Sequence, residues 1–147
     1  MRRLSRFFEL SPAERHQLMV AALLLGLIKI GLMVLPFQRM QNILARLARS
    51  KEQSLLSSDE KRELVVRAVV TASRHMPLSL SCLPQALATF VLLARQGYPA
   101  RVHLGVAKDV EGRLEAHAWV ECQGQIVIGG AERERFTPLV ALEGKSA

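Results

Sequence analysis

The feature that most constrains the fold is a run of eighteen mostly apolar residues, Leu18 to Leu35, interrupted by Lys29. The preceding segment, Ser11 to Glu14, combines an N-cap serine, a proline suited to the first helical turn and a glutamate that completes a capping box. Pro36 lacks the N–H that a helix interior needs, so the helix ends or kinks there. The pattern predicts one long apolar helix, followed by a basic helix from Phe37 to about Arg49.

The run is at the lower limit of length for a membrane-spanning helix. Lys29 lies well inside it, and a central charge costs about 3 kcal/mol on insertion scales. The run begins after Glu9 and Glu14, and no small-residue cleavage site follows it, which argues against a signal peptide. We expect a helix that is buried, or docked on a partner protein or a membrane face. The protein is expected to be cytoplasmic, with membrane association through Leu18 to Leu35 as the alternative.

Composition excludes several classes of protein. The chain has 147 residues, half of them hydrophobic, which suits a single sizeable core. Two cysteines cannot build a disulfide framework or a four-thiolate zinc site. Residues 1–50 hold eight Lys/Arg and two Asp/Glu, a balance of +6, whereas residues 51–147 hold twelve and eleven, a balance of +1. Nucleic-acid binding is not expected, because a basic N-terminal segment alone indicates it weakly and aromatics are scarce.

The remainder of the chain predicts helices followed by strands. A capping box at Ser57 and Glu60 opens an amphipathic helix that ends near His75, and a strongly apolar helix follows from Cys82 to Gly97. Alternating and β-branched residues then predict an antiparallel meander. Its strands are expected at 100–108, 114–121 and 125–128, with turns at 109–112 and 123–124 and a polar tail containing Pro138 after them. This order indicates the α+β class, with an N-terminal helical segment over 1–50 and a core over 51–147.

Cys82 stands at the start of the second of these helices, with Pro84 just inside it. The partial positive charge of a helix N-terminus stabilises a thiolate, and its unpaired backbone N–H groups can hold an oxyanion. The position therefore suits the nucleophile of an acyl-transfer reaction. An inert, buried cysteine is the alternative.

His117 lies in the middle of the second expected strand, between two alanines that leave clearance around the imidazole. A neutral histidine there can take a proton from a thiol and later give it to a leaving amine. A half-buried histidine with a structural role is the alternative, and the upstream helix-start cysteine brings the two interpretations level.

A third group should orient the imidazole. With a two-residue turn at 123–124, His117 faces the Gly129 and Gly130 region, where no carboxylate stands. Glu132, just beyond, is the candidate acid; a solvated role for Glu132 and a backbone carbonyl in its place are the alternatives. Glu121 shares the strand face with His117, but four residues at about 3.3 Å each put it out of reach.

Other candidates complete the site. Trp119 shares the face of His117 and is a candidate wall of the substrate site, with plain packing as the alternative. Cys122 is expected to be structural, and His103 to be packed or exposed. The sequence contains no phosphate loop, dinucleotide fingerprint or metal-ligand spacing, so neither a cofactor nor a metal is expected.

Three segments, Ser81 to Leu87, Gly97 to Val106 and Ala116 to Gly124, resemble the transglutaminase-like domain of lasso-peptide maturation proteases. These are the leader peptidases of microcin-type lasso-peptide clusters, and the resemblance covers residues 55–140. The block Ala-His-Ala-Trp-Val-Glu with the upstream cysteine is the specific part. The N-terminal Ser-Pro-Ala-Glu-Arg start and apolar helix resemble the stand-alone protease form of that family.

The resemblance implies a papain-like core in which Cys82 is the nucleophile and His117 the base. The implied reaction cleaves a ribosomally made precursor peptide between leader and core. In the family the third residue is an acid on the strand after the histidine, and the matching position here is near Gly129, so the chain departs from the family there. The resemblance also implies a separate leader-recognition protein as a partner, because no leader-recognition domain is expected in this chain. A macrolactam cyclase or an exporter is a further candidate partner for Leu18 to Leu35.

The preferred interpretation is a cysteine peptidase that removes the leader from a lasso-peptide precursor. Three alternatives remain open. One is a Cys–His acyl transferase of transglutaminase type, another is a non-catalytic peptide-binding scaffold with a degenerate triad, and the third is a membrane-anchored accessory protein.

Overall fold

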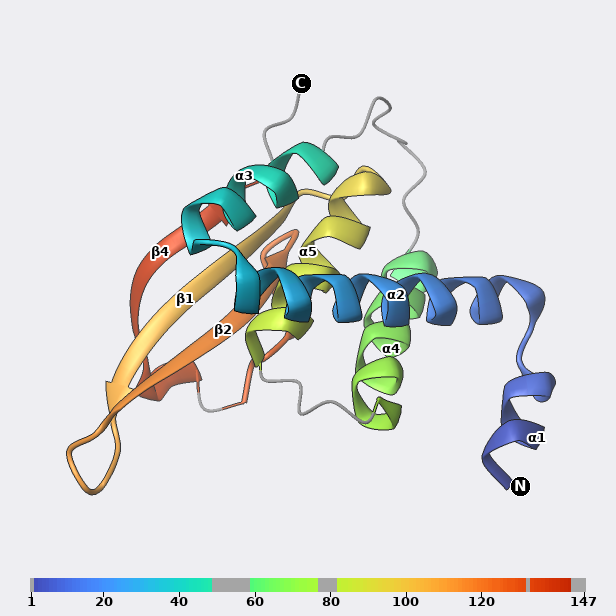
Figure 1. Cartoon of the computed structure of the whole chain (residues 1–147), viewed down its shortest axis with the longest axis horizontal. Coiled ribbons are helices and arrows are strands. Elements are labelled where there is room, and N and C mark those ends of the chain that lie inside the picture. Colours follow the sequence, from blue (N-terminus) through green and yellow to red (C-terminus); the bar gives the residue numbers. More distant parts are fainter. Residues whose placement is uncertain (1, 49–58, 77–81, 132, 144–147) are drawn as a thin grey trace.

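The computed structural model describes residues 2–48, 59–76, 82–131 and 133–143 (Figure 1). The helices are α1 (Arg2–Glu9), α2 (Pro12–Val34), α3 (Phe37–Leu47), α4 (Asp59–His75) and α5 (Cys82–Arg95). The strands are β1 (Ala100–Lys108), β2 (Leu114–Cys122), β3 (Gln125–Ile128) and β4 (Thr137–Glu143), with a short 3₁₀ helix η1 (Arg133–Arg135) before β4. The α+β class predicted from the sequence is confirmed. The predicted division between residues 50 and 51 falls outside the described residues.

The start of α2 is the capping box that the sequence predicts. The Ser11 hydroxyl accepts a hydrogen bond from the Glu14 backbone N–H at 3.2 Å, and the Glu14 carboxylate accepts one from the Ser11 N–H at 2.8 Å. The helix ends at Leu35, whose extended backbone leads into Pro36. Ser57, the first residue of the second predicted capping box, lies outside the described residues.

The capping box makes the stability of α2 depend on pH. Hydrogen bonds from the Ser11 backbone and side chain lower the pKa of Glu14 below its ordinary value of 4.5. A lowered carboxyl pKa contributes stability that is present above the unfolded value and is lost as the pH falls through the folded value. Glu14→Gln keeps a side chain that can cap but removes the charge. We expect urea denaturation to show the wild type more stable than Glu14→Gln at neutral pH, and the difference to shrink as the pH falls below 4.5. A difference independent of pH would contradict this assignment.

The sheet has the strand order β3-β2-β1-β4, and all neighbouring strands are antiparallel. Gln123 and Gly124 both have positive φ, 53° and 78°, as a two-residue hairpin turn requires. β3 is short, and a bulge between Val120 and Glu121 interrupts its pairing with β2. The positive φ values of Gln123 and Gly124 confirm the turn predicted between β2 and β3.

Two elements differ from the sequence prediction. The segment around Pro138 is not a polar tail, because β4 pairs with β1 and forms the fourth strand of the sheet. Pro138 has no N–H to donate, which an edge strand tolerates. α1 was not expected either; it is short and strongly polar on average.

A hydrophobic core joins α2, α3, α4 and α5 to one face of the sheet, and α1 lies apart from it (Figure 1). α5 packs directly on β1 and β2, and α2, α3 and α4 pack around α5. The sheet contributes Val102, Ala118 and Val120 to this core. Because side chains alternate between the two faces of a strand, His103, His117 and Trp119 lie on the opposite face.

Candidate functional site

The two cysteines have different environments. Cys82 is the first residue of α5, as predicted, and is partly exposed, while Pro84 is buried in the same turn. Cys122 is fully buried in β2, and burial raises the pKa of its thiol. Because the thiolate is the reactive form, Cys122 is the less suitable nucleophile.

The imidazole of His117 is held from the end of β3. Its Nε2 lies 2.7 Å from the backbone carbonyl oxygen of Gly129. A carbonyl oxygen can only accept a hydrogen bond, so Nε2 carries the proton and donates it. In the neutral ring the lone pair is then on Nδ1, which is the nitrogen that can take up a proton. The two-residue turn predicted this neighbour, and the structure places a backbone carbonyl beside the ring.

Gly129 is the residue that allows this close approach. Its φ is +76°, and a Cβ built on it would lie 2.5 Å from the carbonyl oxygen of Ala118. A side chain at position 129 would therefore strain the backbone and push β3 away from β2. Glu132, the predicted third residue of the site, lies outside the described residues.

Aromatic rings surround His117 on its face of the sheet. The rings of Trp119 and Phe136 both stack on that of His117. The distance between ring centroids is 6.0 Å for Trp119 and 4.9 Å for Phe136. Trp119 is only 3% exposed, so its ring mainly contacts these neighbours. Packing on two rings fixes the orientation of the imidazole, and contact between Trp119 and a substrate stays a prediction.

His103 and Glu121 form a pair that the sequence analysis missed. The Nε2 atom of His103 lies 3.1 Å from a carboxylate oxygen of Glu121, and the His103 ring stacks on Trp119 at 5.6 Å. The register of β1 and β2 places His103 opposite Trp119, so Glu121 is its diagonal neighbour on the same face. The alternation of residues along β2 places Trp119 and Glu121 on one face. Only the register of β1 and β2 shows that His103 lies beside both of them.

Gly105 leaves room for these rings. It lies opposite His117 in the pairing of β1 with β2. A Cβ built on Gly105 would lie 2.9 Å from the Trp119 ring and 3.0 Å from Cβ of Phe136. We expect Gly105→Ala to lower the free energy of unfolding by about 1–3 kcal/mol through overpacking, as measured by urea denaturation.

Gly26→Ala is the matched control for this variant. A Cβ on Gly26 meets only the end of Met76, at 3.7 Å, and alanine suits a helix interior better than glycine. We expect Gly26→Ala to raise the free energy of unfolding by up to about 1 kcal/mol. If Gly105→Ala changed the free energy of unfolding no differently from Gly26→Ala, the rings around Gly105 would not be tightly packed.

The structure does not join Cys82 to His117 directly. Among the described residues, no hydrogen bond links the Cys82 thiol to the imidazole. The ring of His117 lies on the sheet face that α5 does not cover, as the alternation along β2 requires.

The two clefts between α2 and α4 lie away from Cys82 and His117, and the described residues hold no cluster of metal ligands. Two clefts lie between α2 and α4, where Glu14, Leu64 and Arg67 line both of them, and neither includes Cys82 or His117. In the part of the chain that the structure describes, no group of three or more His, Cys, Asp and Glu residues is placed to hold a metal ion.

Comparison with protein-family models matches residues 24–141 to the model described as the Transglutaminase-like superfamily. The match begins inside α2 and ends in β4, so it spans both Cys82 and His117. Searches of curated proteins and of solved structures return no match.

Proposed function

Since this chain belongs to the transglutaminase-like superfamily, we propose that it is a cysteine peptidase with Cys82 as nucleophile and His117 as base. The superfamily contains cysteine-dependent proteases and transferases, so the match supports a cysteine-based peptidase or acyltransferase. The finer proposal concerns the substrate, which is the leader segment of a ribosomally made lasso-peptide precursor. It rests on the resemblance of the segments around Cys82 and His117 to leader peptidases.

The hydrogen bond from Nε2 of His117 to Gly129 is the observation that carries the proposal. It fixes the proton on Nε2 and leaves Nδ1 as the basic nitrogen. It also stabilises the imidazolium that forms when Nδ1 takes up a proton, because the carbonyl dipole faces the charged ring. The Gly129 carbonyl thus performs the orienting role of the acid in a catalytic triad.

The reaction then follows two steps. The Cys82 sulfur attacks the scissile carbonyl carbon, its proton passes to Nδ1 of His117, and backbone N–H groups at the start of α5 stabilise the oxyanion. The imidazolium returns that proton to the leaving amine, which frees the core peptide and leaves the leader as a thioester. Water, deprotonated by His117, hydrolyses the thioester and restores the thiol.

α5 and the His117 ring lie on opposite faces of the sheet, so the proposal requires Cys82 and His117 to meet around the edge of β2, beyond the end of β3. α5 and β1 run in opposite directions (Figure 1). A helix of the length of α5 is about 21 Å long at 1.5 Å per residue, which corresponds to about six residues of a strand. Counting about six residues on from Ala100, the start of α5 is then level with Gly105 and Val106, the partners of His117 and Ala116. β3 ends at Ile128, opposite Val120, so β2 has no paired strand on that side at His117.

Mass spectrometry of a lasso-peptide precursor incubated with the full chain tests the proposed reaction, with and without a leader-recognition protein. We expect two fragments whose masses sum to that of the precursor plus one water. A product that has lost ammonia and gained an amide linkage would indicate an acyltransferase. An unchanged precursor under both conditions would contradict the proposal.

A non-catalytic peptide-binding scaffold is the second candidate. The lack of a hydrogen bond between Cys82 and His117 among the described residues favours it. Iodoacetamide labelling distinguishes the two functions, because a base within reach of the thiol accelerates alkylation. Labelling of Cys82 that is equally fast in the wild type and in His117→Gln would support the scaffold.

A further inference from the structure

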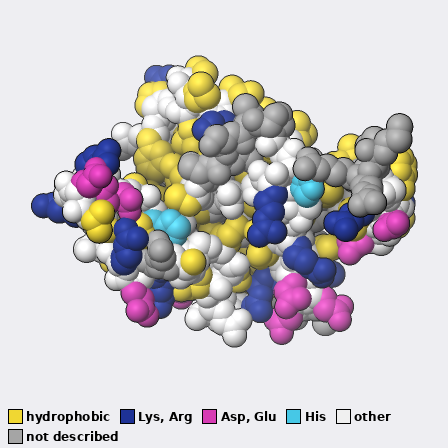
Figure 2. Space-filling view, turned by 90° about the horizontal axis from the view of Figure 1, so that it is seen from below, with side chains coloured by type: hydrophobic (Ala, Val, Ile, Leu, Met, Phe, Trp, Pro, Cys, Tyr) yellow, Lys and Arg dark blue, Asp and Glu magenta, His cyan; other side chains and the backbone are white. Residues whose placement is uncertain are grey.

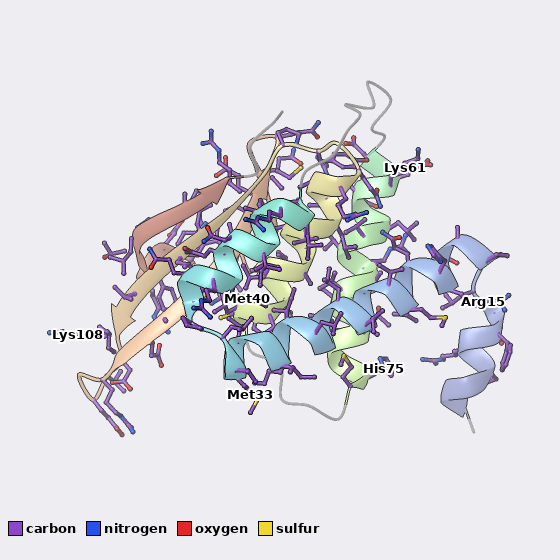
Figure 3. The ribbon with its side chains drawn as sticks, turned by 45° about the horizontal axis from the view of Figure 1, so that its top comes forward. Arg15, Met33, Met40, Lys61, His75 and Lys108 are labelled. Atoms are coloured by element: carbon purple, nitrogen blue, oxygen red, sulfur yellow. The ribbon has the colours of Figure 1, made fainter. Side chains whose placement is uncertain are left out.

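α2 presents two different apolar faces. Its inner face packs on α4 and α5, where Ala21, Leu25 and Ile28 are fully buried. Its outer face carries apolar side chains that are each more than half exposed: Met19, Leu23, Leu27, Ile30, Met33 and Val34. The first five of these positions recur every three or four residues and Val34 adjoins Met33, so the six form one continuous stripe, here called the α2 stripe. Met33 points away from the body of the molecule (Figure 3).

The size of the α2 stripe sets it apart from the scattered apolar residues of an ordinary surface. From Met19 to Val34 it extends about 22 Å along the helix. Exposed contiguous apolar patches are uncommon on monomeric proteins and mark interaction sites. Figure 2 shows hydrophobic side chains along the upper edge of that view, with Lys and Arg side chains beside them. The stripe therefore needs an occupant.

A membrane-spanning arrangement does not suit this helix, although α2 is long and apolar enough to cross a bilayer by length and composition. Its inner face is part of the protein core over several turns, so lipid cannot surround it. A helix with one face on a protein and an apolar outer face suits the plane of a membrane interface.

The positive charge of the segment around α2 indicates that the membrane surface bound by the stripe is anionic. Residues 1–50 carry a balance of +6, as counted above. Arg39 and Arg46 are exposed, lie on one face of α3 beside the exposed Ile43, and have no ion-pair partner among the described residues. Basic side chains next to an apolar helix face attract anionic lipid headgroups.

We infer that the α2 stripe binds an anionic membrane surface, with α2 lying in the plane of the interface. This surface does not include Cys82 or His117, so the inference is independent of the proposed peptidase chemistry. Binding through the α2 stripe holds the chain at a membrane, and the sheet face that carries His117 is not part of the lipid-binding surface.

Vesicle flotation of the full chain tests this inference. We expect the wild type to float with vesicles of phosphatidylcholine and phosphatidylglycerol, and much less with phosphatidylcholine alone. Replacing Leu23, Leu27 and Ile30 together by Gln is expected to reduce flotation by roughly tenfold or more. Arg39→Gln with Arg46→Gln is expected to reduce it by roughly fivefold per charge.

The matched control replaces three apolar residues that are equally exposed elsewhere, Val110, Leu114 and Leu139, by Gln. We expect this variant to float as the wild type does, and circular dichroism to show that all variants fold. Flotation of the wild type no better than a vesicle-free control would overturn the inference, and so would equal flotation with neutral vesicles. Retention on membranes after alkaline carbonate would overturn it in favour of a spanning helix. A dimer that dissociates only in the α2 triple variant would assign the stripe to a second copy of the chain instead.

Discussion

Cys82→Ala is expected to lower the rate of precursor cleavage by about 10⁴-fold or more, because without the sulfur no acyl-enzyme can form. Cys82 is partly exposed and lies at a helix end, so its loss should change the free energy of unfolding by no more than about 1 kcal/mol. Cleavage is measured by mass spectrometry, and stability by urea denaturation of the same preparation.

Cys122→Ala is the matched control, and it should show the opposite pattern. Cys122 is fully buried against the core, so truncation leaves a small cavity and costs about 1 kcal/mol of stability. Its thiol takes no part in the proposed chemistry, and cleavage should stay near the wild-type rate. Cleavage at the wild-type rate by Cys82→Ala, or loss of cleavage in a folded Cys122→Ala, would show that Cys82 is not the nucleophile.

Gly129→Ala has the second large expected effect. The new Cβ meets the Ala118 carbonyl oxygen at 2.5 Å, and the residue keeps an unfavourable positive φ. We expect the free energy of unfolding to fall by about 2–4 kcal/mol. In the molecules that remain folded, displacement of the carbonyl from Nε2 of His117 should lower kcat by about 10²-fold. Gly129→Asp supplies the acid of the resembling family, but should do no better because its Cβ meets the same oxygen.

Gly124→Ala separates backbone strain from this close approach. Gly124 has nearly the same φ, +78°, yet a Cβ there meets nothing within 4 Å. This variant should lose about 1–2 kcal/mol of stability from the left-handed backbone alone and should keep its kcat. If the two glycine variants lost stability and kcat equally, Gly129 would have no special role in holding His117.

The sequence predicts those parts of this site in which a short turn sets the register between two neighbouring strands. The two-residue turn at Gln123 and Gly124 fixes the pairing beside it, so the position of His117 in the region of Gly129 could be predicted, whereas the bulge between Val120 and Glu121 could not. The loop between β1 and β2 is longer and does not determine the register, so the pairing of His103 with Glu121 could not.

The same reasoning applies to the fold. Local signals fix the start of α2, because the capping box and Pro36 act on neighbouring residues. β4 depends on pairing with β1, more than thirty residues earlier, and no local signal in the sequence reveals such a pairing. The exposure of α2 was also not predictable, because a helix that is apolar on all sides does not reveal which face the core will cover.

The central claim is that the Cys82 sulfur meets Nδ1 of His117, and bifunctional alkylation tests this most directly. Dibromoacetone reacts first with a thiolate and then with a nucleophile a few bonds away. In the Cys122→Ala background, we predict one cross-linked pair of peptides that joins position 82 to Nδ1 of position 117. The cross-link should be absent in His117→Gln. Single alkylation of Cys82 without a cross-link, or a cross-link to His103, would contradict the claim.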